Sequence, residues 1–411
     1  MYISKIHLKN IRCFEEIELD LTGDAGIRNW TVILGNNGLG KTTLLRSIAV
    51  GLCDPTSAAG LISDLQGDWV RQGANTNTGS ISVTLLDPER ERECHSEIEI
   101  VNKGGREQIE IKKNPMTSDL GDDIFVCGYG AGRGIQGTRD YRKYRTQDSV
   151  YTLFDYETSL QNPELTLRRL ASRESNLNEI LGSIDQILML TSPSTELDDS
   201  GISIKGPWGD VPFGSVGDGY KSTLTWVTDF LGWAIFHHGK VLDRDSLRGI
   251  VLLDEIEQHL HPTWQRHIVS LLHTQFPKTQ FIGTSHSPLC ASGSADLNDE
   301  EYRLVVLERD EHNGSVEANE LASLRGLRAD QVLTSTAFGL EETRNPSIET
   351  ELRSFRNLLL SKSLSSSEKR ELTRLRDSIE NQLPGLAERE EDRALERKLW
   401  QRMKDRSATD E

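Results

Sequence analysis

Apolar and polar residues alternate at the start of the chain, where YISKIHLKNIRCFEEIELDL follows a period of two. This pattern predicts two half-buried strands that meet near Asn10. The apolar run TVIL predicts a buried strand that leads directly into a glycine-rich loop. Residues 80–113 predict further antiparallel strands, joined by turns such as Lys103-Gly104-Gly105, and DDIFVCGYG predicts another buried strand.

The period changes to that of a helix between residues 160 and 190. Apolar residues recur there three or four positions apart, at Leu167, Leu170, Leu177, Ile180, Ile184 and Ile187. One or two helices are predicted, sufficient for a short arm. The segment GPWGDVPFGSVGDGY then predicts a loop, and a helix follows through Trp226, Phe230 and Trp233.

The next segments alternate again between strand and helix. RGIVLLDE predicts a strand, TWQRHIVSLLHTQF a helix, and TQFIGTSHSP a strand that ends in a polar loop. From about 345 the chain becomes helical and highly charged. One apolar stripe there comprises Ile348, Leu352, Phe355 and Leu359, and a second comprises Leu395, Leu399 and Met403. The whole pattern predicts an α/β fold.

Composition narrows the class of protein. Acidic residues outnumber basic ones by 64 to 47, and the formal net charge of -17 argues against nonspecific binding to nucleic acid or membranes. The five cysteines form no C-x-x-C pair, which is typical of a reducing compartment and excludes a zinc framework. MYISKIHLKN lacks the apolar core of a signal peptide, and the apolar stretch 224–236 is interrupted by Asp229. We therefore expect a cytoplasmic protein with no membrane contact.

The segment ILGNNGLGKTTLLRSIA matches the phosphate-loop pattern G-x-x-x-x-G-K-[ST]. Its glycines allow a tight turn whose N–H groups approach phosphates, and the following helix adds its positive N-terminus. Lys41 is expected to neutralise the β- and γ-phosphates, and Thr42 to bind Mg²⁺. An ordinary strand–helix turn is the alternative, which the flanking strand and helix disfavour. The expected nucleotide-binding residues are Arg12, Gly35, Asn36, Asn37, Gly38, Leu39, Gly40, Lys41, Thr42 and Thr43.

A second acidic site follows the apolar strand of IVLLDEIEQHLHP. Next to a phosphate loop, Asp254 is expected to hold Mg²⁺ and Glu255 to deprotonate the attacking water. His286, in FIGTSHSP, is expected to sense a γ-phosphate, although a surface loop histidine would look the same. The histidines at 259–273 lack an H-E-x-x-H pattern, so a metal site among them is not expected.

These motifs, in this order, resemble the ABC-type ATPases of the SMC, RecF and OLD group. KIHLKNIRCFEEIELDL is similar to their N-terminal strand pair, GNNGLGKTT to Walker A, VLLDEIEQHLHP to Walker B with its D-loop, and TSHSP to their switch histidine. The resemblance implies an ABC-type P-loop ATPase head, ATP and Mg²⁺ as cofactors, Glu255 and His286 as catalytic residues, and an N-terminal antiparallel β subdomain. A short helical insertion and a C-terminal helical extension complete the expected fold.

The resemblance also predicts a signature loop of the form L-S-G-G-Q, which faces the γ-phosphate bound to a second chain. Gly217, Asp218 and Gly219 align with it. Gly217 replaces the family serine, so either the hydroxyl contact is lost or Ser215 supplies it. The family Q-loop glutamine is also missing from GYGAGRG, and Arg133 is expected to act near the phosphates instead. A composite site of this kind implies a dimer or a higher homo-oligomer.

A narrower resemblance is to PtuA-type defence ATPases of Septu systems and related retrons, which work beside an HNH nuclease; the ATPase of PARIS systems is similar in plan. It depends on G-D-G-Y, Y-G-A-x-R, DEIEQHLHPTWQ and LRADQVLTSTAFGLEETRNP. The expected function is an ATPase that hydrolyses ATP, oligomerises and controls a separate effector nuclease in anti-phage defence. The alternative is a RecF-like DNA-repair ATPase that acts directly on DNA. The N-terminal strand pair argues against a third class, the ATPase subunit of a membrane transporter.

A basic and aromatic segment, GRGIQGTRDYRKYRTQ, leaves a nucleic-acid contact open. It contains Arg139, Arg142, Lys143 and Arg145 with Tyr141 and Tyr144 between them. A solvated loop beside an acidic body is the favoured interpretation. No nuclease site is expected in the chain, because helices rather than a second acidic strand are predicted after RLVVLERDE.

We expect four segments along the chain. They are an N-terminal ATPase lobe with Walker A (1–140), a helical insertion (141–205), a C-terminal lobe with the signature, Walker B and switch histidine (206–325), and a helical region for assembly or partner binding (326–411). The apolar stripes of the last segment must be buried, either against the ATPase body or against a second protein.

Overall fold

The computed structural model describes residues 1–24, 26–65, 67–117, 121–133, 138–141, 143–173, 177–238, 244–310, 314–321, 323–340, 343, 345–360 and 365–382. It divides into two compact units, Met1–Gly339 and Leu340–Glu411. The predicted four-segment division is finer than this one and stays a prediction. The second apolar stripe of the tail, Leu395, Leu399 and Met403, lies outside the described residues, as does Arg142.

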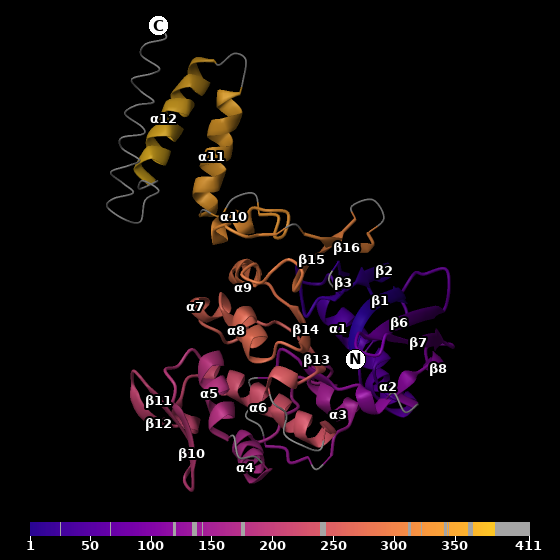
Figure 1. Ribbon diagram of the computed structural model, residues 1–411. Coiled ribbons are helices and arrows are strands. Elements are labelled where there is room, and N and C mark those ends of the chain that lie inside the picture. Colours follow the sequence, from indigo (N-terminus) through magenta and orange to yellow (C-terminus); the bar gives the residue numbers. More distant parts are fainter. Residues whose placement is uncertain are drawn as a thin grey trace. The chain divides into compact units, whose positions relative to one another are not determined.

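A six-stranded sheet forms the centre of the first unit, in the order β16-β15-β5-β14-β13-β9 (Figure 1). All neighbours are parallel except β16, which is antiparallel to β15. The strands are β5 (Trp30–Gly35), β9 (Val126–Tyr129), β13 (Gly249–Leu253), β14 (Thr279–Thr284), β15 (Tyr302–Arg309) and β16 (Val316–Glu320). Successive residues of β13 point into different cores, since Val251 and Leu253 join one cluster and Ile250 and Leu252 the other. Burial on both faces explains the continuous apolar runs.

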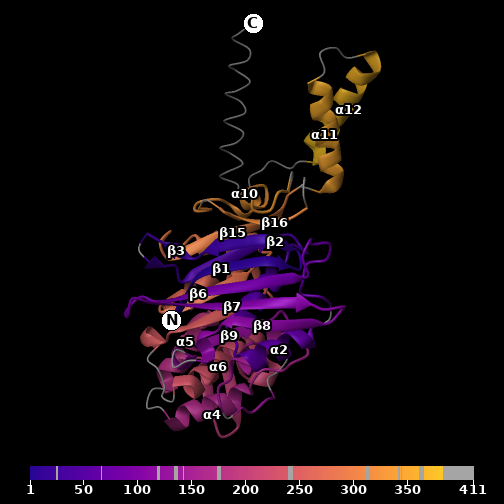
Figure 2. The same ribbon diagram turned by 90° about the vertical axis from the view of Figure 1, so that its right-hand side faces the viewer.

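A five-stranded antiparallel sheet, in the order β2-β1-β6-β7-β8, forms the N-terminal subdomain (Figure 2). Its strands are β1 (Tyr2–Ile11), β2 (Phe14–Asp20), β6 (Thr78–Asp87), β7 (Arg92–Asn102) and β8 (Glu107–Lys113). Alternate residues such as Ile81, Val83 and Ile98 are buried in one cluster with Leu44 and Ile48 of α1 (Lys41–Gly51). The period of two in the sequence therefore reflects one buried face and one polar face. A two-stranded ribbon, β3 (Thr22–Gly23) and β4 (Gly26–Ile27), follows β2.

The opposite face of the central sheet is covered by helices. The longest contribution comes from α6 (Asp218–His238), whose Trp226, Phe230 and Trp233 share a core with Trp30 and Phe281 of the sheet. The other described α-helices of this unit, besides α1, are α2 (Pro55–Asp64), α3 (Thr146–Val150), α4 (Pro163–Arg173), α5 (Leu177–Ile187), α7 (Pro262–Gln265), α8 (Ile268–Gln275), α9 (Pro288–Ser294) and α10 (Ala329–Leu333). Among the described residues no helix combines the length and apolar character needed to span a bilayer.

Several local predictions were wrong. Part of the predicted loop at 206–220 is a strand, because β10 (Thr195–Asp198), β11 (Gly201–Gly206) and β12 (Gly209–Pro212) form a small antiparallel sheet. The predicted helix after 262 is divided into α7 and α8. Helices do not follow β15 directly, since β16 pairs with it. The missed strands β12 and β16 are short and carry few apolar residues, so their patterns are weak.

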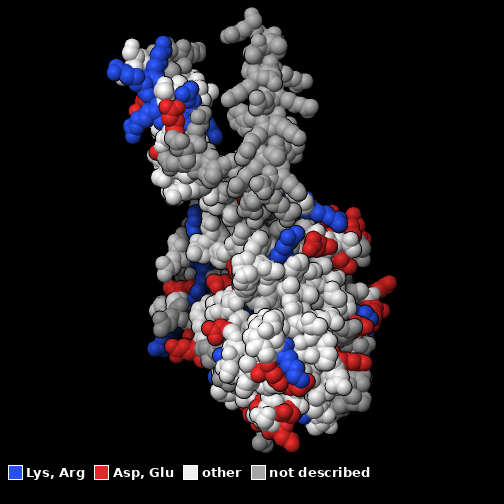
Figure 3. All heavy atoms as spheres, turned by 90° about the vertical axis from the view of Figure 1, so that its left-hand side faces the viewer, with Lys and Arg blue, Asp and Glu red and all other residues white. Residues whose placement is uncertain are grey.

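The second unit contains a helical hairpin of α11 (Pro346–Leu359) and α12 (Ser366–Gln382). Leu375 and Ile379 of α12 are buried, whereas the side chains of Leu359 and Leu360 are 58% and 76% exposed. Lysine and arginine side chains gather on this hairpin (Figure 3). They are Arg353, Arg356, Lys369, Arg370, Arg374 and Arg376.

Candidate nucleotide site

The glycine-rich loop lies between the end of β5 and the start of α1. Gly38 and Gly40 have φ angles of 80° and 89°, in the left-handed region that favours glycine. A Cβ on Gly40 would lie 2.3 Å from Cys13 Sγ, so the turn is also fitted to the N-terminal sheet. The first turn of α1 contains no acidic residue, and Gly40 provides no side-chain cap. The N-terminus of this helix therefore suits an external anion.

Lys41 opens α1 and is only 6% exposed. Its ammonium group donates hydrogen bonds to the carbonyl oxygens of Gly35, at 2.7 Å, and Asn36, at 3.1 Å. Burial lowers the pKa of Lys41, and the carboxylate of Asp254 opposes this effect. A phosphate group would supply the buried cation with a charged partner.

Asp254 follows β13 and is almost completely buried. The Thr42 hydroxyl donates to its Oδ2 at 2.7 Å, and the Thr284 hydroxyl donates to its Oδ1 at 2.6 Å. Thr284, at the end of β14, also accepts a hydrogen bond from the backbone N–H of Glu255 at 2.8 Å. Thr42 and Asp254 thus place two oxygen donors side by side, and oxygen is the donor atom that Mg²⁺ prefers. Sequence reasoning assigned no role to Thr284, although this residue directly precedes the Ser285-His286 pair.

His286 is held by a third carboxylate that sequence reasoning also missed. Glu257 accepts hydrogen bonds from the Ser285 hydroxyl at 2.7 Å and from the backbone N–H of His286 at 2.6 Å. Burial lowers the pKa of His286, and the nearby Lys41 lowers it further. The imidazole is therefore neutral at pH 7 and can accept or donate a hydrogen bond.

These groups surround one cavity of about 300 Å³. The volume is of the size typical of small-molecule sites. Its walls are formed by Arg12, Cys13, Asn37, Gly38, Gly40, Lys41, Thr42, Thr43, Asp254, Glu255 and His286. Gly35, Asn36 and Leu39 belong to the same loop without lining the cavity. The walls of the cavity thus supply a buried ammonium, a helix N-terminus, a hydroxyl and two carboxylates. This set of groups fits a nucleoside triphosphate with Mg²⁺.

The predicted signature residues lie elsewhere. Gly217, Asp218 and Gly219 are at the N-terminus of α6 and do not line the cavity. A Cβ on Gly219 would lie 2.6 Å from the carbonyl oxygen of His259, so this turn packs on the segment that follows Walker B. The next residue, Tyr220, has ring-centroid distances of 5.2 Å to Trp208 and 5.3 Å to Trp264.

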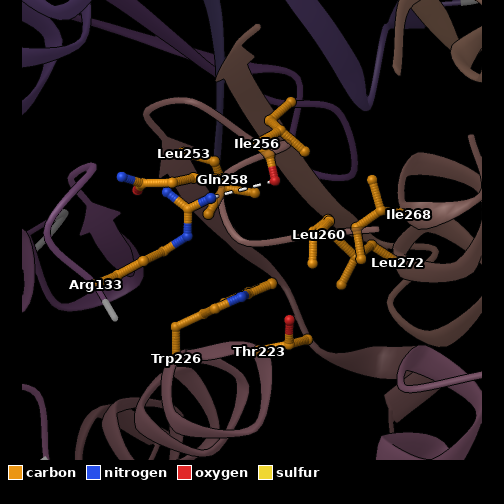
Figure 4. Close-up of a pocket in the computed structure, with 9 residues that line it drawn as sticks. All are labelled: Arg133, Thr223, Trp226, Leu253, Ile256, Gln258, Leu260, Ile268 and Leu272. Carbon is orange, nitrogen blue, oxygen red and sulfur yellow. Dashed lines mark hydrogen bonds between the residues drawn. The ribbon is translucent and has the colours of Figure 1, made fainter. Parts of the chain in front are cut away.

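Arg133 was expected to act near the phosphates, but its guanidinium is directed elsewhere. Arg133 is 3% exposed, and its guanidinium donates to the carbonyl oxygens of Asp254 and, at 2.5 Å, of Glu255. It also donates to the carbonyl oxygen of Ile256 at 3.2 Å, as Figure 4 shows. Burial lowers its pKa to about 10, so the group remains charged at neutral pH. The guanidinium thus binds the backbone of residues 254–256, which we call the Walker B turn. It lies beside Trp226 of α6 (Figure 4).

The aromatic residues of the basic segment are partly buried and pack against the core. The Tyr141 ring lies 4.6 Å from that of Trp233, and the Tyr144 hydroxyl donates to Val126 O at 3.0 Å. Arg139 donates to the Tyr141 hydroxyl at 2.7 Å. Both rings are thus partly engaged by contacts within the chain, and a nucleic-acid contact of this segment stays a prediction. Within the described ranges, no group of three or more His, Cys, Asp or Glu side chains could hold a metal, which includes the histidines at 259–273.

Comparison with known proteins identifies the family of the chain. A family model described as "AAA domain, putative AbiEii toxin, Type IV TA system" matches residues 30–292, and one described as "AAA ATPase domain" matches residues 1–55. The chain belongs to this family of ATPases. Its resemblance to the SMC, RecF and OLD group is confirmed.

Two relatives are proteins named Septu protein PtuA. The one from Bacillus mycoides is 27% identical over 92% of this chain and 50% of its own length. The one from Bacillus thuringiensis is 24% identical over 80% of this chain and 85% of its own length. The chain thus spans only half the length of the first relative.

A solved structure, an SMC head bound to the C-terminal winged-helix domain of ScpA, has the same fold. Its TM-score is 0.51 at 16% identity, and the match covers 79% of this chain and 98% of that one. This similarity confirms the predicted ABC-type head.

Proposed function

We propose that the protein binds and hydrolyses Mg-ATP at the cavity between the phosphate loop and the Walker B turn. The observation that carries this proposal is the 2.7 Å contact between the Thr42 hydroxyl and the Asp254 carboxylate, in one cavity with Lys41 and Glu255. Mg²⁺ held by Thr42 and Asp254 would neutralise charge on the β- and γ-phosphates.

Different residues of the chain then bind the phosphates and activate the water. Lys41 and the N-terminus of α1 bind the phosphates. Glu255 accepts a proton from a water whose oxygen bonds to the γ-phosphorus, while the bond to the β–γ bridging oxygen breaks. The products are ADP and inorganic phosphate. His286, which lines the same cavity, would contact the γ-phosphate.

Assembly into a dimer or higher homo-oligomer is the second part of the proposal. Gly217 and Asp218 are exposed at the start of α6 and do not serve the cavity of their own chain. Trp208, beside Tyr220, is 47% exposed. An exposed aromatic residue beside a helix N-terminus is suited to a protein contact. The signature turn would then complete the ATP site of a second chain.

The cellular role proposed here is anti-phage defence in the cytoplasm, with ATP controlling a separate effector nuclease such as an HNH protein. The two relatives named Septu protein PtuA support it. The RecF-like alternative requires direct DNA binding, and the packed rings of Tyr141 and Tyr144 do not favour this reading.

Nucleotide chemistry is tested with fluorescent ATP and phosphate release. Lys41→Ala should weaken Mg-ATP binding about tenfold to a hundredfold, because a charge-assisted contact is lost. Glu255→Gln should keep binding and slow hydrolysis about a hundredfold. Lys205→Ala and Glu196→Gln remove exposed charges of the small β10–β12 sheet, where neither residue lines the cavity, and serve as matched controls. Unchanged binding in Lys41→Ala would contradict the site.

The role is tested by co-purification with the product of the neighbouring gene. We expect an HNH-type protein to co-purify and its cleavage of DNA to depend on ATP and Glu255. If the chain alone binds DNA in an ATP-dependent manner and no nuclease associates, the repair ATPase is the better description.

A further inference from the structure

The turn between β1 and β2 forms part of the wall of the nucleotide cavity. It consists of Arg12 and Cys13, and both residues line the cavity. The Cys13 thiol lies 3.7 Å from the carbonyl oxygen of Leu39, and a Cβ on Gly40 would lie 2.3 Å from Cys13 Sγ. The turn therefore packs on the phosphate loop itself. Arg12 and Lys41 are the two arginine or lysine residues in the described part of the cavity wall.

A segment from another part of the chain, residues 69–71, holds the backbone of this turn. The N–H of Arg12 donates to the carbonyl oxygen of Trp69 at 2.8 Å, and the N–H of Arg71 donates to that of Asn10 at 2.9 Å. Asn10 and Arg12 have φ angles of 51° and 47°, in the left-handed region that residues other than glycine rarely adopt. A backbone of this kind persists only where its surroundings fix it. The 69–71 segment therefore determines the conformation at Arg12.

Trp69 also orders the side chain of Arg12. The guanidinium carbon of Arg12 lies over the Trp69 ring, 5.2 Å from its centroid, within the range of a cation–π contact. Trp69 is fully buried, so its ring presents a fixed surface. A guanidinium directs its N–H donors within its own plane, where the oxygens of a phosphate can accept them. Stacking on Trp69 thus orients the donors of Arg12.

A carboxylate from the far edge of the N-terminal sheet fixes the 69–71 segment in turn. Glu107 opens β8, which is separated from β1 by β6 and β7. One oxygen of Glu107, Oε1, accepts hydrogen bonds from the N–H groups of Trp69 and Val70, both at 2.7 Å. Hydrogen bonds to an ionised acceptor are about twice as strong as neutral ones. Glu107 therefore holds the residue that contacts both the backbone and the side chain of Arg12.

We propose that Glu107 is a positioning residue of the nucleotide site. Through Trp69 it holds the Arg12 guanidinium where this group donates to the phosphate oxygens of bound nucleotide. A nucleoside triphosphate carries more negative charge than one Mg²⁺ and the Lys41 ammonium neutralise, and a guanidinium suits the remaining oxygens. This inference depends on the proposed binding of Mg-ATP and extends it to a strand that carries no nucleotide motif. A role of Glu107 in the stability of the sheet alone is the competing explanation.

A double-mutant cycle separates the two explanations. Glu107→Ala removes the carboxylate, Arg12→Ala removes the cation, and the double variant removes both. Glu107→Gln keeps an acceptor oxygen for the two N–H groups. Glu110→Ala is the matched control, because Glu110 is exposed on the same strand and its carboxylate accepts from Lys112 Nζ at 3.1 Å. If Glu107→Ala does not fold, Glu107→Asp, which withdraws the carboxylate by one methylene, replaces it in the cycle.

The affinity for fluorescent Mg-ATP is measured on each variant, together with urea unfolding. Arg12→Ala should weaken the affinity about tenfold to a hundredfold, because a charge-assisted contact is lost. Glu107→Ala should weaken it by about fivefold to tenfold, which is less than the loss of the cation itself. In the double variant Glu107→Ala should add no further loss, since the residue that it positions is gone. Glu107→Gln should retain nearly all of the affinity, and Glu110→Ala should bind as the unmodified protein does.

Two results would overturn the inference. One is an unchanged affinity in Glu107→Ala. The other is a loss from Glu107→Ala that is equally large with and without Arg12, which would assign the effect to the sheet. If the unmodified protein does not bind Mg-ATP, the proposed function fails by itself, and amide hydrogen exchange of residues 10–13 then tests Glu107. This exchange should be faster in Glu107→Ala than in Glu110→Ala, and equal rates would overturn the positioning role as well.

Discussion

Arg133 donates a hydrogen bond of 2.5 Å to the carbonyl oxygen of Glu255, whose backbone has a φ of 50°. This left-handed conformation is unfavourable for a glutamate, at a cost of about 1–3 kcal/mol. The guanidinium also bonds the carbonyl of Ile256. Arg133 therefore stabilises the backbone that aims the Glu255 carboxylate into the cavity.

Arg133→Lys should keep ATP binding and reduce hydrolysis about tenfold, because one ammonium group cannot reproduce the planar fork of donors. Steady-state kcat and fluorescent-ATP affinity measure the two effects. Arg168→Lys, at an exposed pair with Glu164, is the matched control. Equal kcat values for the two variants would show that the Walker B turn does not need this arginine.

Thr284→Val should weaken the same site from the side of β14. Valine has nearly the same shape, but it leaves the buried Asp254 carboxylate and the Glu255 N–H without their shared hydroxyl. We expect a loss of about 1–3 kcal/mol in the free energy of unfolding, together with slower hydrolysis. Thr274→Val removes an exposed hydroxyl that donates to Ser270 O and should change neither quantity. Urea unfolding that is the same in both variants would contradict this account.

Asp229 predicts a pH dependence of stability. This carboxylate is buried on α6, accepts from the Tyr129 hydroxyl at 2.9 Å and from Gln161 N at 2.9 Å, and burial raises its pKa to about 6. A raised pKa in the folded state stabilises the protein at low pH, and this contribution is lost as the pH rises through 6. The free energy of unfolding of Asp229→Asn, relative to the unmodified protein, should thus increase by about 2 kcal/mol between pH 4 and pH 7. Urea titrations at both pH values test this, and a difference that is independent of pH would rule it out.

The helical hairpin of the second unit leads us to expect that ATP binding and assembly depend on different parts of the chain. A chain that ends near Asn345 should still bind ATP, because every residue that lines the cavity belongs to the first unit. We expect it to lose its partner or its higher assembly in light scattering and pull-down experiments. Full assembly of the truncated chain would mean that the tail only packs.

A milder variant covers the case in which truncation prevents folding. The exposed pair Leu359→Glu and Leu360→Glu leaves Leu375 and Ile379 buried in the hairpin. The same loss of assembly is expected from it, with an unchanged melting temperature. Retained assembly would place the partner surface outside this pair.

The sequence predicted the fold well where the apolar period extends over whole elements, as in β1, β6 and α6. Gly35 to Thr43 and Asp254-Glu255 were recognised because each is a contiguous motif with a fixed spacing. Thr284 and Glu257 were given no role, and Arg133 was given the wrong one. Their roles depend on which backbone each side chain reaches across the fold, and a linear pattern does not contain this information. Short strands such as β12 and β16 were missed because pairing, rather than apolar content, stabilises them.

The position of β14 between β5 and β13 has a consequence for protein synthesis. The phosphate loop and the Asp254-Glu255 pair are not on neighbouring strands, since Thr31 pairs with Ile282 and Val251 pairs with Phe281. Chains emerge from the ribosome N-terminus first, and contacts that are distant in sequence form late. A nascent chain that displays the complete phosphate loop therefore cannot assemble the nucleotide site until residue 284 has left the ribosome. A chain that ends before β14 lacks the assembled nucleotide site. Such a fragment would therefore not enter an assembly that depends on bound ATP.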